Sequence, residues 1–175
     1  MGAQHVVTTA APPEKKTSET ASVYVEGIIA GMIGAAVIAI WFLILDSING
    51  RPLYTPTVLG TALFRGGVAL ASREILPVSL EMVLLYTCVH GIAFCTIGAA
   101  ASRFLAIAEM NPDLGFGILL LFIVFEAGFI SVSMFFAEEV LQALAWAAVF
   151  VGNLLAASAM AIYFWRKHTN LTIRP

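Results

Sequence analysis

Four long apolar stretches limit what this chain can fold into. They cover residues 24–45, 80–105, 114–137 and 140–165. Each can cross a hydrocarbon core of about 30 Å as an α-helix, which needs about 20 residues. The stretches are continuous rather than alternating, which argues against a membrane β-barrel. Hydrophobic residues make up 60% of the chain and charged residues 11%, whereas a soluble domain needs far more polar residues to cover its surface. We predict an all-α membrane protein with four transmembrane helices in an antiparallel bundle.

The polar ends of the chain frame this bundle. Residues 1–22 are rich in Thr, Ala and Pro and carry several charges, so we expect a flexible polar N-terminal tail. The tail lacks an apolar segment followed by a small-residue cleavage site, so we do not expect a cleaved signal peptide. Residues 23–168 would form the four-helix transmembrane domain and residues 169–175 a C-terminal tail. Glu138 and Glu139 separate the last two apolar stretches, which predicts a tight hairpin there.

A long connection, residues 47–79, joins the first two predicted helices. Thr55-Pro56 suits a helix start, with proline at the first helical position. Gly66-Gly67 suits its end, and residues 69–76 would form a second short piece. We expect an amphipathic loop helix in the membrane interface, with a lid, docking surface or re-entrant segment as the alternative. Its apolar side would contain Val58, Leu59, Ala62, Leu63 and Phe64.

The basic residues predict the orientation in the membrane. An even number of spans places both termini on one side, and six of the nine Lys and Arg residues lie there. An excess of basic residues marks the cytoplasmic side. We therefore expect cytoplasmic termini, an extracytoplasmic loop after the first span, and location in a bacterial inner membrane. The six are Lys15, Lys16, Arg103, Arg166, Lys167 and Arg174; the other three are Arg51, Arg65 and Arg73.

Small residues recur at helical spacing in the first two spans. Such stripes let helix backbones approach closely where lipid removes the hydrophobic drive for association. The pattern does not decide whether the partner helix belongs to the same chain or to another. Cys88 and Cys95 lie on the stripe of the second span, which favours packing over a metal or redox role. The predicted seams are Gly27, Gly31 and Gly34 in the first span and Cys88, Gly91, Cys95, Gly98 and Ser102 in the second.

Three polar residues interrupt the apolar stretches near their midpoints. They are His90 in the second span, Glu126 in the third and Asn153 in the fourth. An ionisable group at the bilayer centre costs at least about 2.5–3.5 kcal/mol on insertion scales, so such groups face inward and pair. We predict one shared interior site, with Glu126 accepting a hydrogen bond from His90. A structural polar lock between helices is the leading interpretation, and a ligand, proton or ion site is the alternative.

Enzymatic and cofactor chemistry finds little support in the sequence. It contains no nucleophile elbow, Walker motif, HExxH or CxxC, so we predict a non-catalytic protein without a metal or cofactor of its own. A bis-histidine haem needs two histidines within the membrane, and His90 is the only histidine within a predicted span.

Our leading hypothesis is a small accessory or assembly subunit of a larger inner-membrane complex, such as an energy-transducing one, or a homo-oligomer. The alternatives are a small homo-oligomeric transporter or proton/ion channel that uses Glu126 and His90, and a membrane protein that binds a quinone or another cofactor. The basic residues form no patch suited to nucleic acid.

Overall fold

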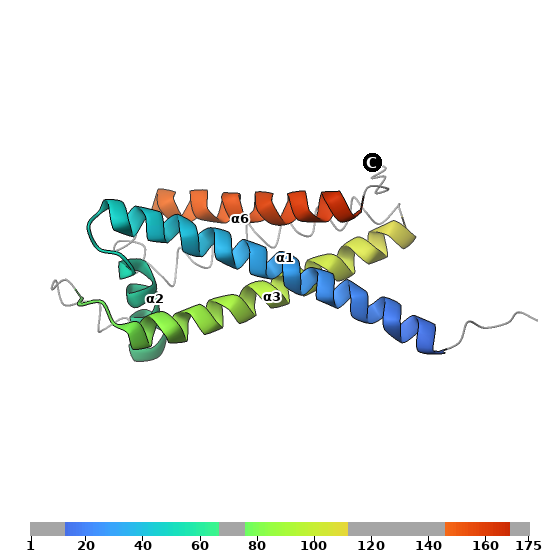
Figure 1. Ribbon diagram of the computed structural model, residues 1–175, viewed down its shortest axis with the longest axis horizontal. Helices are drawn as coiled ribbons and strands as arrows, with labels where there is room; N and C mark the ends of the chain where they lie inside the picture. The colour runs from blue at the N-terminus through green and yellow to red at the C-terminus, as the bar shows by residue number, and fades with distance from the viewer. Residues whose placement is uncertain (1–12, 67–75, 112–145, 169–175) are drawn as a thin grey trace, which may run out of the picture.

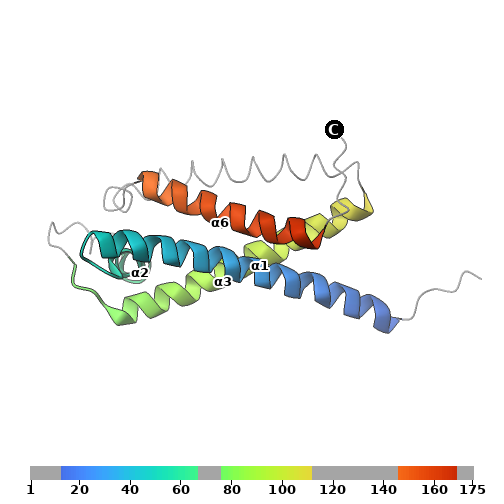
Figure 2. The same ribbon diagram turned by 45° about the horizontal axis from the view of Figure 1, so that its top comes forward.

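The computed structural model describes residues 13–66, 76–111 and 146–168, and side chains from residue 21 onward except that of residue 146. All secondary structure in this part is helical: α1 (Pro13–Ile48), α2 (Tyr54–Arg65), α3 (Leu80–Met110) and α6 (Trp146–Lys167). α1 runs in the opposite direction to α3 and α6, and α2 lies where α1 ends and α3 begins (Figure 1). A second view, turned by 45°, shows α6 alongside α1 (Figure 2).

Three of the described helices are long and apolar enough to cross a membrane. The spanning segments are Ala21–Ile48, Leu80–Met110 and Ala147–Lys167, which overlap the first, second and fourth predicted spans. The third predicted span, residues 114–137, and the hairpin at Glu138-Glu139 lie outside the described residues, as do the tails 1–12 and 169–175. The all-helical fold is therefore confirmed for the described part of the chain, with three helices long and apolar enough to span a membrane.

α1 begins earlier than the sequence predicts. It starts at Pro13, so residues 13–22, expected to belong to a flexible tail, are helical. Proline is favoured at the first helical position because no intrahelical N–H donor is needed there. The following residues contain alanine, glutamate and lysine, which are good helix formers. Joined to an apolar helix of many turns, they extend an existing helix and avoid the cost of nucleating a new one.

The corner between α1 and α2 is fixed by Asp46, whose side chain is only 6% exposed. Its carboxylate accepts hydrogen bonds from the backbone N–H and the hydroxyl of Thr55 in the first turn of α2. An anion here also complements the positive end of the helix dipole. The turn uses left-handed backbone at Gly50 (φ 69°) and at Leu53 (φ 67°). The left-handed conformation is energetically unfavourable for a non-glycine residue such as Leu53, and the contacts between Asp46 and Thr55 help to hold it.

α2 packs three threonines together with Val58 and Gly60 against the rest of the protein. Its buried residues are Thr55, Thr57, Val58, Gly60 and Thr61, whereas Leu63 and Phe64 are 56% and 46% exposed. Of the expected apolar side, Val58 is thus buried, whereas Leu63 and Phe64 point outward. Two of the threonine hydroxyls form hydrogen bonds with nearby backbone: Thr57 donates to the Leu53 carbonyl and Thr61 to the Thr57 carbonyl. A Cβ on Gly60 would lie 2.4 Å from the Met82 carbonyl oxygen, which shows how closely α2 approaches α3.

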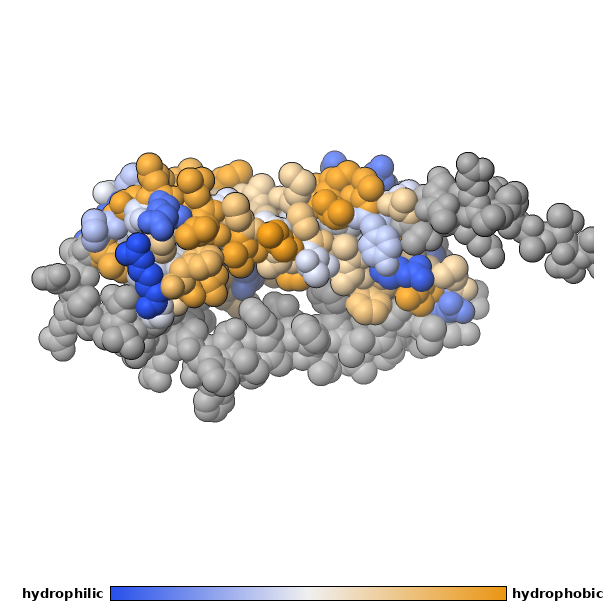
Figure 3. Space-filling model, turned by 90° about the horizontal axis from the view of Figure 1, so that it is seen from below, coloured by the Kyte–Doolittle hydropathy of each residue, from blue (hydrophilic) through white to orange (hydrophobic). Residues whose placement is uncertain are grey.

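The buried core is small and lies between α1, α3 and α6. Ala30, Met160 and Phe164 form its centre, with Phe94 and Leu105 among the residues packed around them. Most large apolar side chains point outward instead; Ile92 is 67% and Leu154 57% exposed. Hydrophobic residues cover much of one face, with hydrophilic ones grouped toward its two ends (Figure 3). This is the distribution expected of helices whose outer surface contacts lipid.

Candidate functional site

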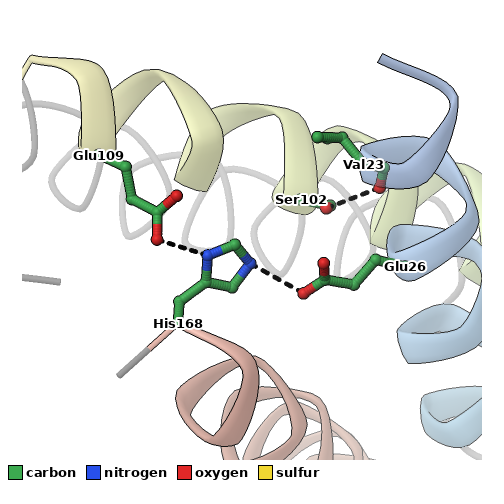
Figure 4. A network of polar contacts seen from close by, with 5 residues as sticks. All are labelled: Val23, Glu26, Ser102, Glu109 and His168. Atoms are coloured by element: carbon green, nitrogen blue, oxygen red, sulfur yellow. Dashed lines mark hydrogen bonds and ion pairs between the residues drawn. The ribbon is translucent and has the colours of Figure 1, made fainter. Parts of the chain in front are cut away.

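The most concentrated polar cluster in the described part of the chain joins the ends of three helices. His168 directly follows α6, and its backbone N–H donates to the Phe164 carbonyl, which continues the helical turn. Its imidazole lies between α1 and α3 (Figure 4). Nε2 is 2.8 Å from a carboxylate oxygen of Glu26 in α1, and Nδ1 is 2.6 Å from a carboxylate oxygen of Glu109 in α3. We call these three residues the His168 clasp.

The protonation state of the His168 clasp follows from counting donors. An ionised carboxylate can only accept hydrogen bonds, and a neutral imidazole has one N–H. With both carboxylates ionised, the two short contacts are both hydrogen bonds only when the imidazole is protonated and donates from both nitrogens. Burial by itself lowers the pKa of His168, but the hydrogen bond to Glu109 and the negative charges of Glu26 and Glu109 outweigh it, so that the pKa is raised. The His168 side chain is only 13% exposed, which limits screening by water.

The His168 clasp adjoins the closest approach of α1 to α3. A Cβ on Gly27, the neighbour of Glu26, would lie 2.5 Å from the Gly98 carbonyl oxygen. A Cβ on Gly31 would lie 2.1 Å from the Phe94 carbonyl oxygen. The Ser102 hydroxyl donates to the Val23 carbonyl at 2.8 Å (Figure 4). Only residues without bulky side chains allow the two backbones to come this near.

Part of the predicted small-residue seams lies in this crossing within one chain. Gly27 and Gly31 of α1 meet Gly98 and Cys95 of α3, and the Cys95 thiol lies 3.9 Å from the Ile28 carbonyl. Gly34 faces α6 as well, because its Cβ would meet both Met160 and Phe94.

The other end of the α3 seam is different. Cys88 is exposed and both cysteines are free. A Cβ on Gly91 would meet no heavy atom within 4 Å among the described residues. Among the described residues, the seam on α3 is thus divided into an occupied half at Cys95–Ser102 and a half at Cys88 and Gly91 without a packing partner, which we call the open half.

His90 lies on a different face of α3, within a row of aromatic rings. Its ring centroid is 5.5 Å from that of Tyr86 and 4.7 Å from that of Phe94, as the spacing of four residues predicts. Nδ1 is 3.5 Å from the Tyr86 hydroxyl. Nε2 is buried and has no hydrogen-bond partner among the described residues. The backbone of Ala35 in α1 is near enough to interact with the ring, but it does not bond to Nε2.

The predicted interior site of His90, Glu126 and Asn153 is only partly visible. Glu126 lies outside the described residues. Asn153 is half-buried on α6, and no hydrogen bond joins it to His90. Its neighbour Gly152 packs against Trp41 of α1, six positions beyond Ala35, or about 9 Å along that helix. Asn153 and His90 therefore lie at somewhat different depths along α1.

The His168 clasp escaped prediction because its members are far apart in the sequence. His168 is 142 positions from Glu26 and 59 from Glu109, and it falls just beyond the last apolar stretch. A sequence signal did exist, since an acidic residue stands near the polar end of two spans and a histidine near the same end of a third. That signal identifies a shared membrane face but not the contact, which depends on how the helices rotate and tilt.

The described side chains suit proton binding and ionic contact better than metal chemistry. No group of three or more His, Cys, Asp or Glu residues within residues 13–66, 76–111 and 146–168 has an arrangement that could hold a metal ion. In the His168 clasp both imidazole nitrogens already face carboxylates, so neither has a free lone pair for a metal.

Searches for similar proteins found no family model, curated protein or solved structure that matches this chain.

Proposed function

We propose that this protein is a small, non-catalytic accessory or assembly subunit of a larger complex in a bacterial inner membrane. One observation carries the proposal: the open half of the α3 seam, at Cys88 and Gly91, where the described part of the chain provides no packing partner. At the occupied half the same pattern of small residues receives the backbone of α1. A transmembrane helix of another subunit would fit the open half by the same close packing.

The use of charged residues agrees with this role. Asp46 holds the start of α2, Glu26 and Glu109 bind His168, and Arg65 pairs with Glu81 between α2 and α3. Each of these groups stabilises the protein's own helix contacts near the polar ends of the spans. Such an arrangement serves a scaffold that presents a fixed transmembrane surface to a larger partner.

The proposed orientation places the His168 clasp at the cytoplasmic face. Arg166 and Lys167 in the last turn of α6 and Arg103 in α3 contribute to the basic excess expected on that side. The corner formed by Asp46 and α2 would then face the opposite, extracytoplasmic side. From Glu26 to Asp46 α1 advances 20 residues, or about 30 Å, which is the thickness of the hydrocarbon core.

The test compares two leucine substitutions on the same helix. Gly91→Leu fills the open half of the seam, whereas Ala93→Leu adds the same kind of side chain two positions away at an exposed site, on a different face. The wild-type protein is purified from its native membrane in mild detergent and its partners are identified by mass spectrometry. We expect Gly91→Leu to lose those partners and Ala93→Leu to retain them, with equal thermal stability of the isolated chains. Purification of the wild type as a lone chain would refute the proposal.

A second candidate, a proton or ion conductor, is favoured by the buried Nε2 of His90. A buried nitrogen without a partner is costly, and an ionisable group in the membrane is a functional candidate. The expected partner is Glu126. Glu126→Gln would then abolish a proton flux in liposomes while leaving expression intact. An unchanged flux would dismiss this candidate without affecting the accessory-subunit proposal.

A further inference from the structure

The His168 clasp has the composition of a pH-dependent contact. We propose that it is a proton-operated switch that holds the end of α6 against α1 and α3 while His168 is protonated and releases it when the proton is lost. The proposal rests on geometry: one imidazole bridges two carboxylates at 2.6 and 2.8 Å from two other helices. It does not depend on whether the protein serves as an accessory subunit.

When His168 loses its proton, the cluster loses both a hydrogen bond and the positive charge that lies between the two carboxylates. The neutral imidazole donates from a single nitrogen, and its other nitrogen then presents a lone pair to the second carboxylate. The cluster changes from one positive and two negative charges to two negative charges alone. Glu26 and Glu109 then repel each other across a half-buried space, where such repulsion is only partly screened.

The charges that face His168 come from each helix packed against it. Glu26 is the contribution of α1 and Glu109 that of α3, and these two carboxylates are the charged groups that act on the imidazole. Arg103 on α3 and Arg166 and Lys167 on α6 have exposed side chains, and within the described part of the chain none of them forms an ion pair with either carboxylate. No described cation therefore replaces the imidazolium when it loses its proton.

The packing of α6 confines the movement to its end. Met160 and Phe164 are 8% and 7% exposed and belong to the buried core, so they keep the body of the helix in place. Trp165, in contrast, is 79% exposed. Beyond Phe164 the residues of α6 are exposed, so that within the described part of the chain His168 is what holds the end of the helix. Release would free His168 and would uncover the carboxylates of Glu26 and Glu109 at the membrane face.

The experiment measures the distance between α3 and the end of α6 by double electron–electron resonance on the full chain in nanodiscs. Spin labels are attached at Met110→Cys and Lys167→Cys, both exposed positions outside the His168 clasp, with Cys88→Ser and Cys95→Ala in the background. We expect a short, narrow distance distribution at about pH 5.5 and a longer, broader one at about pH 9.

Three variants make the assignment specific. His168→Gln should give the broad distribution at both pH values. His168→Lys, a permanent cation over this range, should give the narrow one at both. Glu109→Gln should fold but shift the midpoint to lower pH, because one stabilising carboxylate is lost.

An independent measurement follows the histidine rings themselves. Nitrogen-15 chemical shifts of the imidazoles, assigned with His5→Gln, His90→Gln and His168→Gln, should show His168 protonated at both ring nitrogens in the closed state and titrating at the same midpoint as the distance change. A pH-dependent distance change that persists in His168→Gln would overturn the proposal. So would a narrow, pH-independent distribution in the wild type and in His168→Gln.

Discussion

Asp46 and Thr55 are joined by two hydrogen bonds of 2.7 Å, one from the backbone N–H of Thr55 and one from its hydroxyl, each to a different carboxylate oxygen. Both residues are buried, with exposed fractions of 6% and 3%. A single carboxylate thus ends one membrane-spanning helix and starts the next helix. Hydrogen bonds to a charged group contribute about 1.5–3 kcal/mol, and leaving the buried donors unpaired costs a similar amount.

Removal of this carboxylate should destabilise the corner between α1 and α2. We expect Asp46→Ala to lower the free energy of unfolding by about 1.5–3 kcal/mol, measured by chemical unfolding in detergent. Amide hydrogen exchange in α2 should accelerate. Ser47→Ala is the matched control, because the Ser47 hydroxyl is exposed and bonds only to the Leu43 carbonyl of its own helix. Equal effects of the two substitutions would contradict the role given to Asp46.

The crossing of α1 and α3 should not tolerate a single added methyl group. A Cβ on Gly31 would lie 2.1 Å from the Phe94 carbonyl oxygen, so Gly31→Ala must separate the helices. We expect a loss of about 1–3 kcal/mol in the free energy of unfolding. Gly91→Ala, whose Cβ meets nothing within 4 Å among the described residues, should be neutral or stabilising by up to about 1 kcal/mol. A stabilised Gly31→Ala variant would show that this contact is wrong.

Stability should depend on pH through His168. The pKa of His168 is raised in the folded protein, because hydrogen bonding and charge from Glu109 and Glu26 outweigh burial. The folded state therefore binds the proton more tightly than the unfolded state does. The stabilisation from His168 is fully present below the pKa of this histidine in the unfolded chain, near the usual value of 6.5. It disappears as the pH rises through the raised pKa of His168 in the folded protein. The melting temperature of the wild type in detergent should therefore fall as the pH rises through that range.

The control for this pH dependence is His168→Gln, which cannot gain or lose a proton. Its melting temperature should lie below that of the wild type in mild acid and converge with it in base. His90→Gln retains the His168 clasp and should keep the wild-type dependence. If His168→Gln still loses stability over the same pH interval, another group is responsible.

Trp41 links α1 to α6 near the other end of the spans. Its indole Nε1 donates to the Ala148 carbonyl at 2.9 Å, and a Cβ on Gly152 would lie 2.9 Å from its ring. We expect Trp41→Phe to lower the free energy of unfolding by about 1 kcal/mol through loss of this bond. Trp165→Phe removes an indole that is 79% exposed and should have almost no effect. The two variants can be compared directly in detergent unfolding curves.

The long helices were predictable because length and continuous apolarity suffice to identify a membrane span. The start of α3 at Leu80 agrees with the predicted start of the second stretch, since the hydroxyl of Ser79 caps it by accepting from the Met82 N–H. The contacts between neighbouring helices could be predicted only in part. The seams identified which faces of α1 and α3 permit close approach, but not that Gly27 and Gly98 meet.

The packed face of α2 could not be predicted from hydrophobicity alone. Thr57 and Thr61 each bond to the carbonyl four residues earlier and so lose little on leaving water. Gly60 then brings the Met82 backbone into contact. Hydrophobicity alone gives Leu63 and Phe64 the greater tendency to be buried, but near a membrane they can remain outside and still avoid water.

The crossing of α1 and α3 lies near the middle of both helices and would be the pivot for any change in the angle between them. Gly27 and Gly31 lie at the pivot, and Glu26, held by His168, is beside it. Asp46 lies 15 to 19 residues away, on an arm of about 25 Å. A rotation of about 5° at the pivot would move the Asp46 end by about 2 Å, about the difference between a made and a broken contact for the corner that carries α2. The contact between Asp46 and Thr55 is therefore sensitive to small changes in the angle at which α1 crosses α3.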